Sequence, residues 1–356
     1  MDKKRVLVAM SGGVDSTVCA HLIKASGAYT EGVTMKLWAD NERVCDDPCP
    51  VPDTNCTDAL HACQKLGIKH NSIAYGDRFR KNVVDRFISD YIKGLTPNPC
   101  VECNRHIKFG ALMEYAIANG FDGLATGHYA KLDVTGDGEY VIKKARDEKK
   151  DQTYFLWAVK KEYLPYIIFP LGDRTKDDIR AIALENSFES AHRSDSQDIC
   201  FIPDGEYASF ICSQTDKTFP QGDFISPDGK ILGRHSGIIN YTVGQRKGLG
   251  IALGKPIFVA RKDAERNTVT LCDNEELFET SLTANSVNIL KECALDTPVR
   301  ITAKIRYRHS PAPATAQLLP DGRLKVDFDE PQRAVTPGQS VVIYDGDILL
   351  GGGIIE

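Results

Sequence analysis

Residues 9–16 have the residue types of a loop that binds an anion. In order, they are Ala9, Met10, Ser11, Gly12, Gly13, Val14, Asp15 and Ser16. An apolar run typical of a buried strand precedes them, and a run typical of a helix follows. The first N–H groups of that helix and its dipole favour a phosphate, and the glycines let the backbone approach it. Because Asp15 would repel phosphate, we expect Mg²⁺ to bridge the two.

Two thiols, Cys100 and Cys103, form a C-x-x-C motif. The sequence Thr-Pro-Asn-Pro leads into the motif and is expected to be irregular, because proline disfavours regular structure. The nearby cations Arg105, His106 and Lys108 are expected to lower the pKa of the thiols and to favour a thiolate nucleophile. A zinc half-site and an inert redox pair remain alternatives for the motif.

Other cysteines give weaker signals. Cys45, Cys49, Cys56 and Cys63 lack the paired C-x-x-C spacing of small zinc modules, so we favour no metal there. Cys56 and Cys63 fit the apolar face of a helix. Cys200 lies in a short apolar run after polar residues, and on its own it is typical of a buried, inert thiol.

The elements that would position these residues alternate between strands and helices up to about residue 130. Apolar patterns predict strands at 33–38, 68–75 and 123–126, and helices at 57–66, 77–93 and 109–119. This alternation indicates a mostly parallel, doubly wound sheet, whose ligands bind beyond the carboxyl ends of its strands. Met35 and the turn of Thr126, Gly127 and His128 lie at such ends. Met35 fits core packing and contact with a base or ribose equally well.

Later parts of the chain have a different texture. Thr175 and Asp178 form a capping box that begins a helix ending near residue 186. Residues 206–280 are rich in turns, and from 281 the chain looks all-β, with Asp-Gly hairpin signals and closure into a barrel expected. We therefore expect an α/β protein whose three domains span 1–204, 205–280 and 281–356.

One predicted strand of the barrel, residues 300–308, is strongly basic. Arg300, Lys304, Arg306 and Arg308 would share one face of this strand. Cations stacked along a strand suit a phosphate backbone, and a solvated face is the alternative.

Composition narrows the classes of function. The chain has 356 residues, 42% of them hydrophobic, and a net charge of −5, which argues against indiscriminate nucleic-acid binding. No apolar run is long enough to cross a bilayer and no signal peptide is visible, so we expect a cytoplasmic protein without a membrane partner. Eleven cysteines then indicate metal, redox or catalytic thiols.

The motifs together carry a family resemblance. The sequence at 11–16, Ser-Gly-Gly-Val-Asp-Ser, resembles the SGGxDS loop of pyrophosphate-loop ATPases, which split ATP between its α and β phosphates and adenylate a carbonyl oxygen. With the Thr-Pro-Asn-Pro segment, Cys103, the Asp-Ile-Cys-Phe-Ile run around Cys200, and residues 125–129, 244–250 and 336–339, the chain resembles the tRNA-specific 2-thiouridylase family from residue 5 to its C-terminus. That family thiolates the C2 carbonyl of the wobble uridine, position 34, in tRNAs for Lys, Glu and Gln.

The resemblance implies an adenine nucleotide alpha hydrolase-like N-terminal domain that binds ATP and Mg²⁺ at residues 9–16, with Met35 and Gly127 on the nucleotide. Cys200 would carry a persulfide charged by a sulfur-donor protein, such as a cysteine desulfurase or a sulfur carrier. Cys103 would be the nucleophile that releases the sulfur by forming a disulfide with Cys200. The residues implied to contact the base or the tRNA are Asn98, Pro99, Cys100, His128, Lys150, Asp151, Gln152, Arg306, Tyr307 and Gln339.

One position departs from the family pattern, because many members carry Asp where this chain has Cys100. Cys100, Cys103 and Cys200 could instead ligate a [4Fe–4S] cluster with one iron open for sulfide, and no persulfide would then be needed. A pyrophosphate-loop amidotransferase or synthetase and a non-enzymatic iron–sulfur RNA-binding protein are less favoured alternatives.

Overall fold

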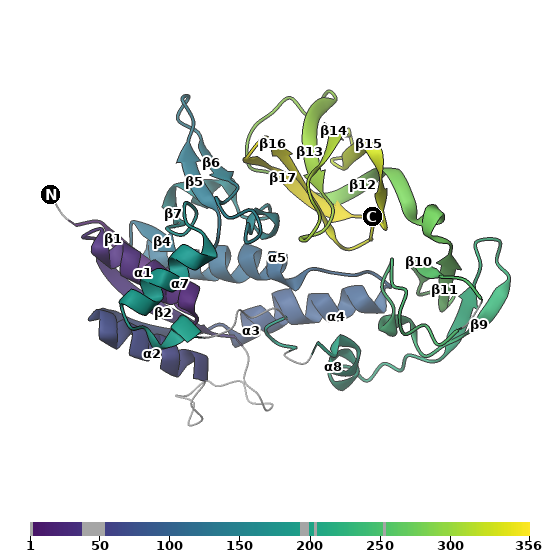
Figure 1. Cartoon of the computed structure of the whole chain (residues 1–356), viewed down its shortest axis with the longest axis horizontal. Helices are drawn as coiled ribbons and strands as arrows, with labels where there is room; N and C mark the ends of the chain where they lie inside the picture. Colours follow the sequence, from purple (N-terminus) through teal and green to yellow (C-terminus); the bar gives the residue numbers. More distant parts are fainter. Residues whose placement is uncertain (1–2, 38–53, 193–198, 203–204, 252–253) are drawn as a thin grey trace.

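A computed structural model describes residues 3–37, 54–192, 199–202, 205–251 and 254–356 (Figure 1). These residues form a five-stranded, a four-stranded and an eight-stranded sheet. Cys45, Cys49 and Asp198, which figured in the sequence motifs, lie outside the described residues. Among the described residues, no helix has the length and apolar content needed to cross a membrane.

The five-stranded sheet is parallel and has the order β3-β2-β1-β4-β7. Its strands are β1 (Arg5–Ala9), β2 (Tyr29–Lys36), β3 (Lys69–Ala74), β4 (Gly123–Ala125) and β7 (Ile167–Ile168). Val6 and Val8 pack on one face against α1 (Val14–Ala25), α2 (Thr54–Leu66) and α7 (Lys176–Glu185), while Leu7 packs on the other against α6 (Leu112–Ala118). Helices on both faces confirm the doubly wound α/β sheet.

Two long helical stretches lead from this sheet toward the barrel (Figure 1). The first runs through α3 (Gly76–Phe79), a π-helical turn (Arg80–Val84) and α4 (Asp85–Ile92), as predicted for 77–93. The second runs through α5 (Pro99–Cys103), a π-helical segment (Asn104–Ala111) and α6. The expected irregular structure is confirmed at residues 95–98 and is wrong from Pro99 onward, because Pro99 occupies the first helical turn, where its missing N–H costs nothing.

The central part of the chain combines α8 (Tyr207–Ser213) with a mixed sheet of order β10-β11-β8-β9. Its strands are β8 (Gly222–Ile225), β9 (Ile231–His235), β10 (Phe258–Asp263) and β11 (Thr268–Cys272). Short 3₁₀ helices in the chain span Thr153–Phe155, Lys161–Tyr166, Glu189–His192, Ile238–Asn240 and Asn274–Leu277.

The C-terminal strands close into an antiparallel barrel through pairing of β12 with β17. Its strands are β12 (Phe278–Ile289), β13 (Val299–Lys304), β14 (Ala312–Leu318), β15 (Leu324–Arg333), β16 (Ser340–Asp345) and β17 (Ile348–Ile355). A hairpin of the N-terminal region, β5 (Lys131–Val134) and β6 (Tyr140–Lys143), extends this sheet through a bridge between Lys143 and Ile348. The sequence did not reveal this hairpin.

The predicted basic strand face is also wrong. Strand β13 ends at Lys304. Arg300 is neutralised by Asp329, whose two carboxylate oxygens each accept a hydrogen bond of 2.7 Å. Lys304 is only 8% exposed. The four cations therefore do not form one phosphate-binding row, because pairing and burial remove two of them.

Candidate active site

The loop at 10–13 connects β1 to α1 and is organised by its own hydroxyls. The Ser16 hydroxyl donates to the Gly13 carbonyl at 3.0 Å and accepts from the backbone N–H of Ser11 at 3.2 Å. Gly12 has a φ of +76°, which favours glycine. No side chain caps α1. The first N–H groups of this helix are therefore available to an anion, as the sequence predicts.

The structure brings Gly127 against this loop. A Cβ atom on Gly127 would lie 3.0 Å from the backbone N of Ser16, so a larger residue would crowd the first turn of α1. Met10 is 3% exposed and lies in the core, and Met35, at the end of β2, also packs against core residues. The residues predicted for the nucleotide therefore share one edge of the parallel sheet, beyond the carboxyl ends of β1, β2 and β4.

Asp15, on the first turn of α1, has two partners that sequence reasoning missed. The Lys176 Nζ donates to its two carboxylate oxygens at 2.7 and 2.9 Å, and the Tyr129 hydroxyl donates to it at 2.8 Å. Lys176 follows Thr175, and the capping box of Thr175 and Asp178 forms as predicted. The sequence signal at Lys176 was therefore a helix start, and nothing local pointed to Asp15.

The two thiols of the C-x-x-C motif lie on α5. Asn98 caps this helix by accepting a hydrogen bond from the backbone N–H of Cys100 at 3.1 Å. Cys100 is exposed, whereas Cys103 is 8% exposed and packs among core residues. Burial raises the pKa of the Cys103 thiol to about 12.

Cys200 is held near Cys103 by the packing of its neighbour Phe201. The Phe201 ring packs edge-on against Phe79 and Phe87, with centroid separations of 5.7 and 5.5 Å. Phe201 and Cys103 belong to one core cluster. An ionised Cys200 raises the pKa of both Cys100 and Cys103, in addition to the larger effect of desolvation. The three thiols predicted from the family resemblance therefore lie together.

The nearby cations play different parts. Arg105 and His106 face Glu102, with N···O distances of 3.6 and 3.2 Å. Although burial opposes it, the His106 hydrogen bond and the guanidinium charges hold the pKa of Glu102 below its usual value. Lys108 is the residue whose charge lowers the pKa of all three thiols.

Desolvation nevertheless outweighs Lys108, so each thiol has a raised pKa. The expected lowering of the thiol pKa is therefore wrong in sign. Lys108 also faces His128, next to Gly127: burial first, and then the Lys108 charge, holds the pKa of His128 well below its usual value. The charge of Lys108 thus acts both on the thiols and on His128.

A cluster of metal ligands is not formed by these thiols. Across the described parts of the chain, no three His, Cys, Asp or Glu side chains gather in a way that could hold a metal ion. Nothing in the described residues supports the alternative of a [4Fe–4S] cluster on Cys100, Cys103 and Cys200, and we derive no step through one. Cys56 and Cys63 lie on α2, where Cys63 is buried.

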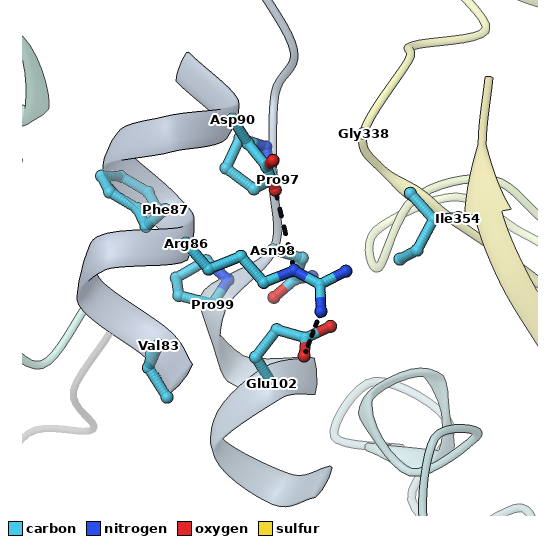
Figure 2. Close-up of a pocket in the computed structure, with 10 residues that line it drawn as sticks. All are labelled: Val83, Arg86, Phe87, Asp90, Pro97, Asn98, Pro99, Glu102, Gly338 and Ile354. Carbon is cyan, nitrogen blue, oxygen red and sulfur yellow. Dashed lines mark hydrogen bonds and ion pairs between the residues drawn. The ribbon is translucent and has the colours of Figure 1, made fainter. Parts of the chain in front are cut away.

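A small pocket lies behind α5, on the side toward α4 and the barrel (Figure 2). Arg86 crosses it and bonds Glu102 at 3.1 Å, with Asp90 at 3.9 Å. Asn98, Pro99 and Gly338 also line it, whereas none of the three thiols does. This pocket lies where α4, α5 and the barrel meet.

The barrel holds the segment that leads into α5. The backbone N–H of Thr96 donates to the Pro337 carbonyl at 2.9 Å, and the Gln339 side-chain amide donates to the Thr96 carbonyl at 2.8 Å. A Cβ atom on Gly338 would lie 2.8 Å from the Thr96 nitrogen. Gln339, predicted as a tRNA contact, thus also positions the catalytic segment.

The remaining predicted tRNA residues lie along the interface of the barrel with the N-terminal region. The Tyr307 ring packs against Phe155 with a centroid separation of 4.5 Å, and Arg306 donates to the Thr336 hydroxyl at 2.7 Å. Asp151 is buried and accepts from Thr153. Two further predicted tRNA residues lie nearby in sequence. Gln152 accepts a hydrogen bond from the Tyr129 N–H at 3.0 Å, and Lys150 is half-buried.

A glycine-containing loop that leads into an uncapped helix, at the carboxyl edge of a doubly wound parallel sheet, is typical of nucleotide-binding α/β proteins. Family models match residues 4–204 (tRNA methyl transferase HUP domain), 208–273 (tRNA methyl transferase PRC-barrel domain) and 279–355 (aminomethyltransferase beta-barrel domain).

Curated relatives match over the whole chain. The tRNA-specific 2-thiouridylase MnmA of Acetivibrio thermocellus is 47% identical over 363 residues, covering 100% of both chains, and that of Clostridioides difficile is 45% identical, covering 99% of this chain and 98% of its own. A solved 4-thiouridine synthetase in complex with RNA and ATP has a TM-score of only 0.36 at 15% identity, covering 59% of this chain and 50% of that one. The chain belongs to the tRNA-specific 2-thiouridylase family.

Proposed function

We propose that this protein is a tRNA-uridine 2-sulfurtransferase that uses ATP to replace the C2 oxygen of a uridine by sulfur. The observation that carries the proposal is that Cys103 and Phe201, the neighbour of Cys200, share one core cluster, while Gly127, the neighbour of His128, packs against the first turn of α1. The charge of Lys108 acts on the three thiols and on His128 alike. An enzyme that adenylates a carbonyl and then delivers sulfur needs a nucleotide site and a pair of thiols within one site.

The first step is activation of the uridine. The uracil O2 attacks the α-phosphate of ATP and pyrophosphate leaves, so AMP becomes the leaving group at C2. The uncapped N–H groups of α1 and the hydroxyls of Ser11 and Ser16 bind the phosphates. Asp15, whose side chain is 33% exposed, fits Mg²⁺ together with these phosphates, and the ion would neutralise phosphate charge.

The second step is sulfur transfer. The terminal sulfur of a Cys200 persulfide attacks C2 and AMP leaves. The Cys103 thiolate then attacks the Cys200 sulfur, which releases 2-thiouridine and forms a Cys103–Cys200 disulfide. A dithiol reductant supplies the two electrons that restore both thiols. Exposure of Cys200 suits its charging by a separate sulfur-donor protein, such as a cysteine desulfurase or a sulfur carrier.

The substrate in this proposal is the wobble uridine of tRNAs for Lys, Glu and Gln, and the compartment is the cytoplasm. A base in an anticodon loop is unstacked at low cost, so it can enter a site of this kind. Asn98, Pro99, Cys100 and His128 are proposed to surround the base. Lys150, Asp151, Gln152, Arg306, Tyr307 and Gln339 are proposed to contact or position the tRNA.

The test is nucleoside mass spectrometry after incubation of these tRNAs with ATP, Mg²⁺, a persulfide donor such as a cysteine desulfurase with cysteine, and a dithiol reductant, run aerobically and anaerobically. The native chain is expected to form 2-thiouridine and release pyrophosphate, and Cys103→Ser and Cys200→Ser to form none. Cys212→Ser is the matched control, because Cys212 is an exposed thiol on α8 outside the site. Full activity of Cys103→Ser would contradict the proposal and favour an amidotransferase or synthetase.

A further inference from the structure

A buried lysine lies against the phosphate loop. Lys176 is the first residue of α7, and α7 packs directly on α1 (Figure 1). The residue is only 6% exposed, and its ammonium makes the two short hydrogen bonds to Asp15. The same ammonium lies 5.8 Å from the centre of the Tyr129 ring, and the Tyr129 hydroxyl also donates to Asp15. The Tyr129 side chain thus contacts both partners of the ion pair, the Asp15 carboxylate and the Lys176 ammonium.

Burying the Lys176 ammonium costs solvation free energy, so the ion pair with Asp15 is more readily explained by a function than by stability. Removing a lysine and a carboxylate from water is unfavourable, and an ion pair in a protein interior is weak evidence for a stabilising role. A bare Asp15 carboxylate on the first turn of α1 would repel phosphates strongly in the reduced dielectric of the loop. With Lys176 paired to it, the loop instead carries no net charge at this point.

The lysine that accompanies this loop comes from a distant part of the chain. The P-loop of many nucleotide-binding proteins carries a lysine within the loop itself, whereas residues 9–16 contain none. In the folded chain a lysine arrives from a residue 161 positions away in sequence. An ammonium with three donors can serve a carboxylate and a phosphate oxygen together.

We propose that Lys176 is the phosphate-binding cation of the loop: paired with Asp15 in the absence of nucleotide, it contacts the phosphate oxygens of bound ATP. In this position it also stabilises the charge of the departing pyrophosphate. The inference rests on the proposed binding of ATP at residues 9–16. It makes Lys176 a catalytic residue, with Asp15 and Tyr129 as the residues that position it.

The test measures nucleotide binding by calorimetry on the full chain at a fixed Mg²⁺ concentration, with ATP and adenosine as the two probes. Lys176→Met is expected to weaken ATP binding about tenfold or more, the loss typical of one charge-assisted hydrogen bond. Adenosine binding is expected to stay unchanged, because adenosine has no phosphate. Lys143→Met is the matched control, since Lys143 pairs with Asp133 in the β5–β6 hairpin, away from the loop.

A second comparison keeps the test decisive if an unpaired Asp15 prevents Lys176→Met from folding. Asp15→Asn alone leaves the cation in place, and Asp15→Asn with Lys176→Met removes both charges without leaving an unpaired one. The double variant is expected to bind ATP about tenfold more weakly than Asp15→Asn. Equal ATP affinity of these two proteins, or an equal loss of ATP and adenosine binding, overturns the inference. A native chain that binds neither probe overturns the proposed nucleotide binding itself, and the inference with it.

Discussion

Cys103 is a buried thiol whose protonation is set by two opposing effects. Desolvation raises its pKa to about 12, and the positive charge of Lys108 acts in the other direction. In the proposed mechanism the attack of Cys103 on Cys200 requires the thiolate, which desolvation disfavours and the Lys108 charge favours. We therefore expect Lys108 to assist this attack.

Lys108→Gln is expected to raise the pKa of Cys103 and Cys200 further, because it removes the charge that favours the thiolates. The thiolate fraction at a given pH then falls, and the rise of thiolation activity with pH moves to higher pH. Alkylation rates of the two cysteines, followed by mass spectrometry over a pH series, measure this directly. Lys108→Arg keeps the charge and serves as the control, and identical profiles for all three proteins would contradict the expectation.

Cys100 separates the two chemical routes considered from the sequence. The persulfide route uses Cys103 and Cys200 alone, so Cys100→Ser is expected to keep most of the thiolation activity, as is Cys100→Asp. A route through an iron–sulfur cluster would lose its third thiolate in Cys100→Ser. The measurement is 2-thiouridine formed under anaerobic conditions, and loss of activity in Cys100→Ser alone would count against the persulfide route.

At the scale of elements, Cys200 is positioned by an aromatic anchor rather than by a helix or strand. Phe201 is 5% exposed and packs against Phe79, Phe87 and Phe210. These rings come from α3, α4 and α8. The short segment 199–202 therefore takes its position from the α3–α4 stretch, which is distant in sequence, and from the nearby α8.

Phe201→Ala is expected to slow sulfur transfer while ATP binding persists, because Cys200 loses its anchor and the nucleotide edge does not. The free energy of unfolding falls by about 3–5 kcal/mol, as for a buried Phe truncated to Ala. Denaturant unfolding and the rate of Cys103–Cys200 disulfide formation are the two measurements. Phe278→Ala, at a ring that is 42% exposed, is the control and should change neither. A normal rate of disulfide formation in Phe201→Ala would show that Cys200 is positioned otherwise.

Local patterns predicted the parts of this fold that depend on local structure. The phosphate loop, the parallel strands and the capping box at Thr175 each follow from neighbouring residues. The partners Lys176 and Asp15 could not be predicted, because tertiary packing alone joins them. Two prolines suggested irregular structure where Pro99 in fact begins a helix, since the effect of proline depends on its position in the turn.

The meeting of the thiols was predicted only through the family resemblance. Nothing in the sequence around Cys200 marks it as a partner of Cys103, because Phe201 and the rings around it are ordinary core residues. The sign of the thiol pKa shift was missed for a similar reason. Charge can be read from a sequence, whereas the burial that outweighs it belongs to the folded chain.

On the scale of the whole molecule, the barrel is a support for the catalytic segment. Residues 336–339 contact Thr96 through two backbone-directed hydrogen bonds and through the close approach of Gly338. Lys262, on β10, is half-buried and donates to the Leu95 carbonyl at 3.4 Å, so the central sheet reaches the same segment. Burial holds the pKa of Lys262 down to about 8. All three parts of the chain therefore converge just before α5.

Gly338→Ala is expected to reduce the rate of thiolation with little change in ATP affinity. Its φ is +90° and its new Cβ would press on the Thr96 nitrogen, which displaces the entry to α5. Gly346→Ala is a matched control in the same barrel, because its φ is +56° but nothing lies within 4 Å of the new Cβ. Both variants bear backbone strain, and only Gly338→Ala is expected to slow catalysis. Equal rates for the two variants would contradict this role of the barrel.

The core shared between the barrel and the N-terminal region constrains how this chain can be divided. Trp157 donates to the Ser340 hydroxyl at 3.0 Å, and Tyr154 donates to the Ser340 carbonyl. The hairpin β5–β6 continues the barrel sheet. In a fragment ending before β12, the rings of Tyr154 and Trp157 would be exposed to solvent and β6 would become an unpaired edge strand. Exposed apolar surface and unpaired strand edges both promote aggregation. Although the sequence looks modular, we expect the N-terminal region and the barrel to fold as one cooperative unit.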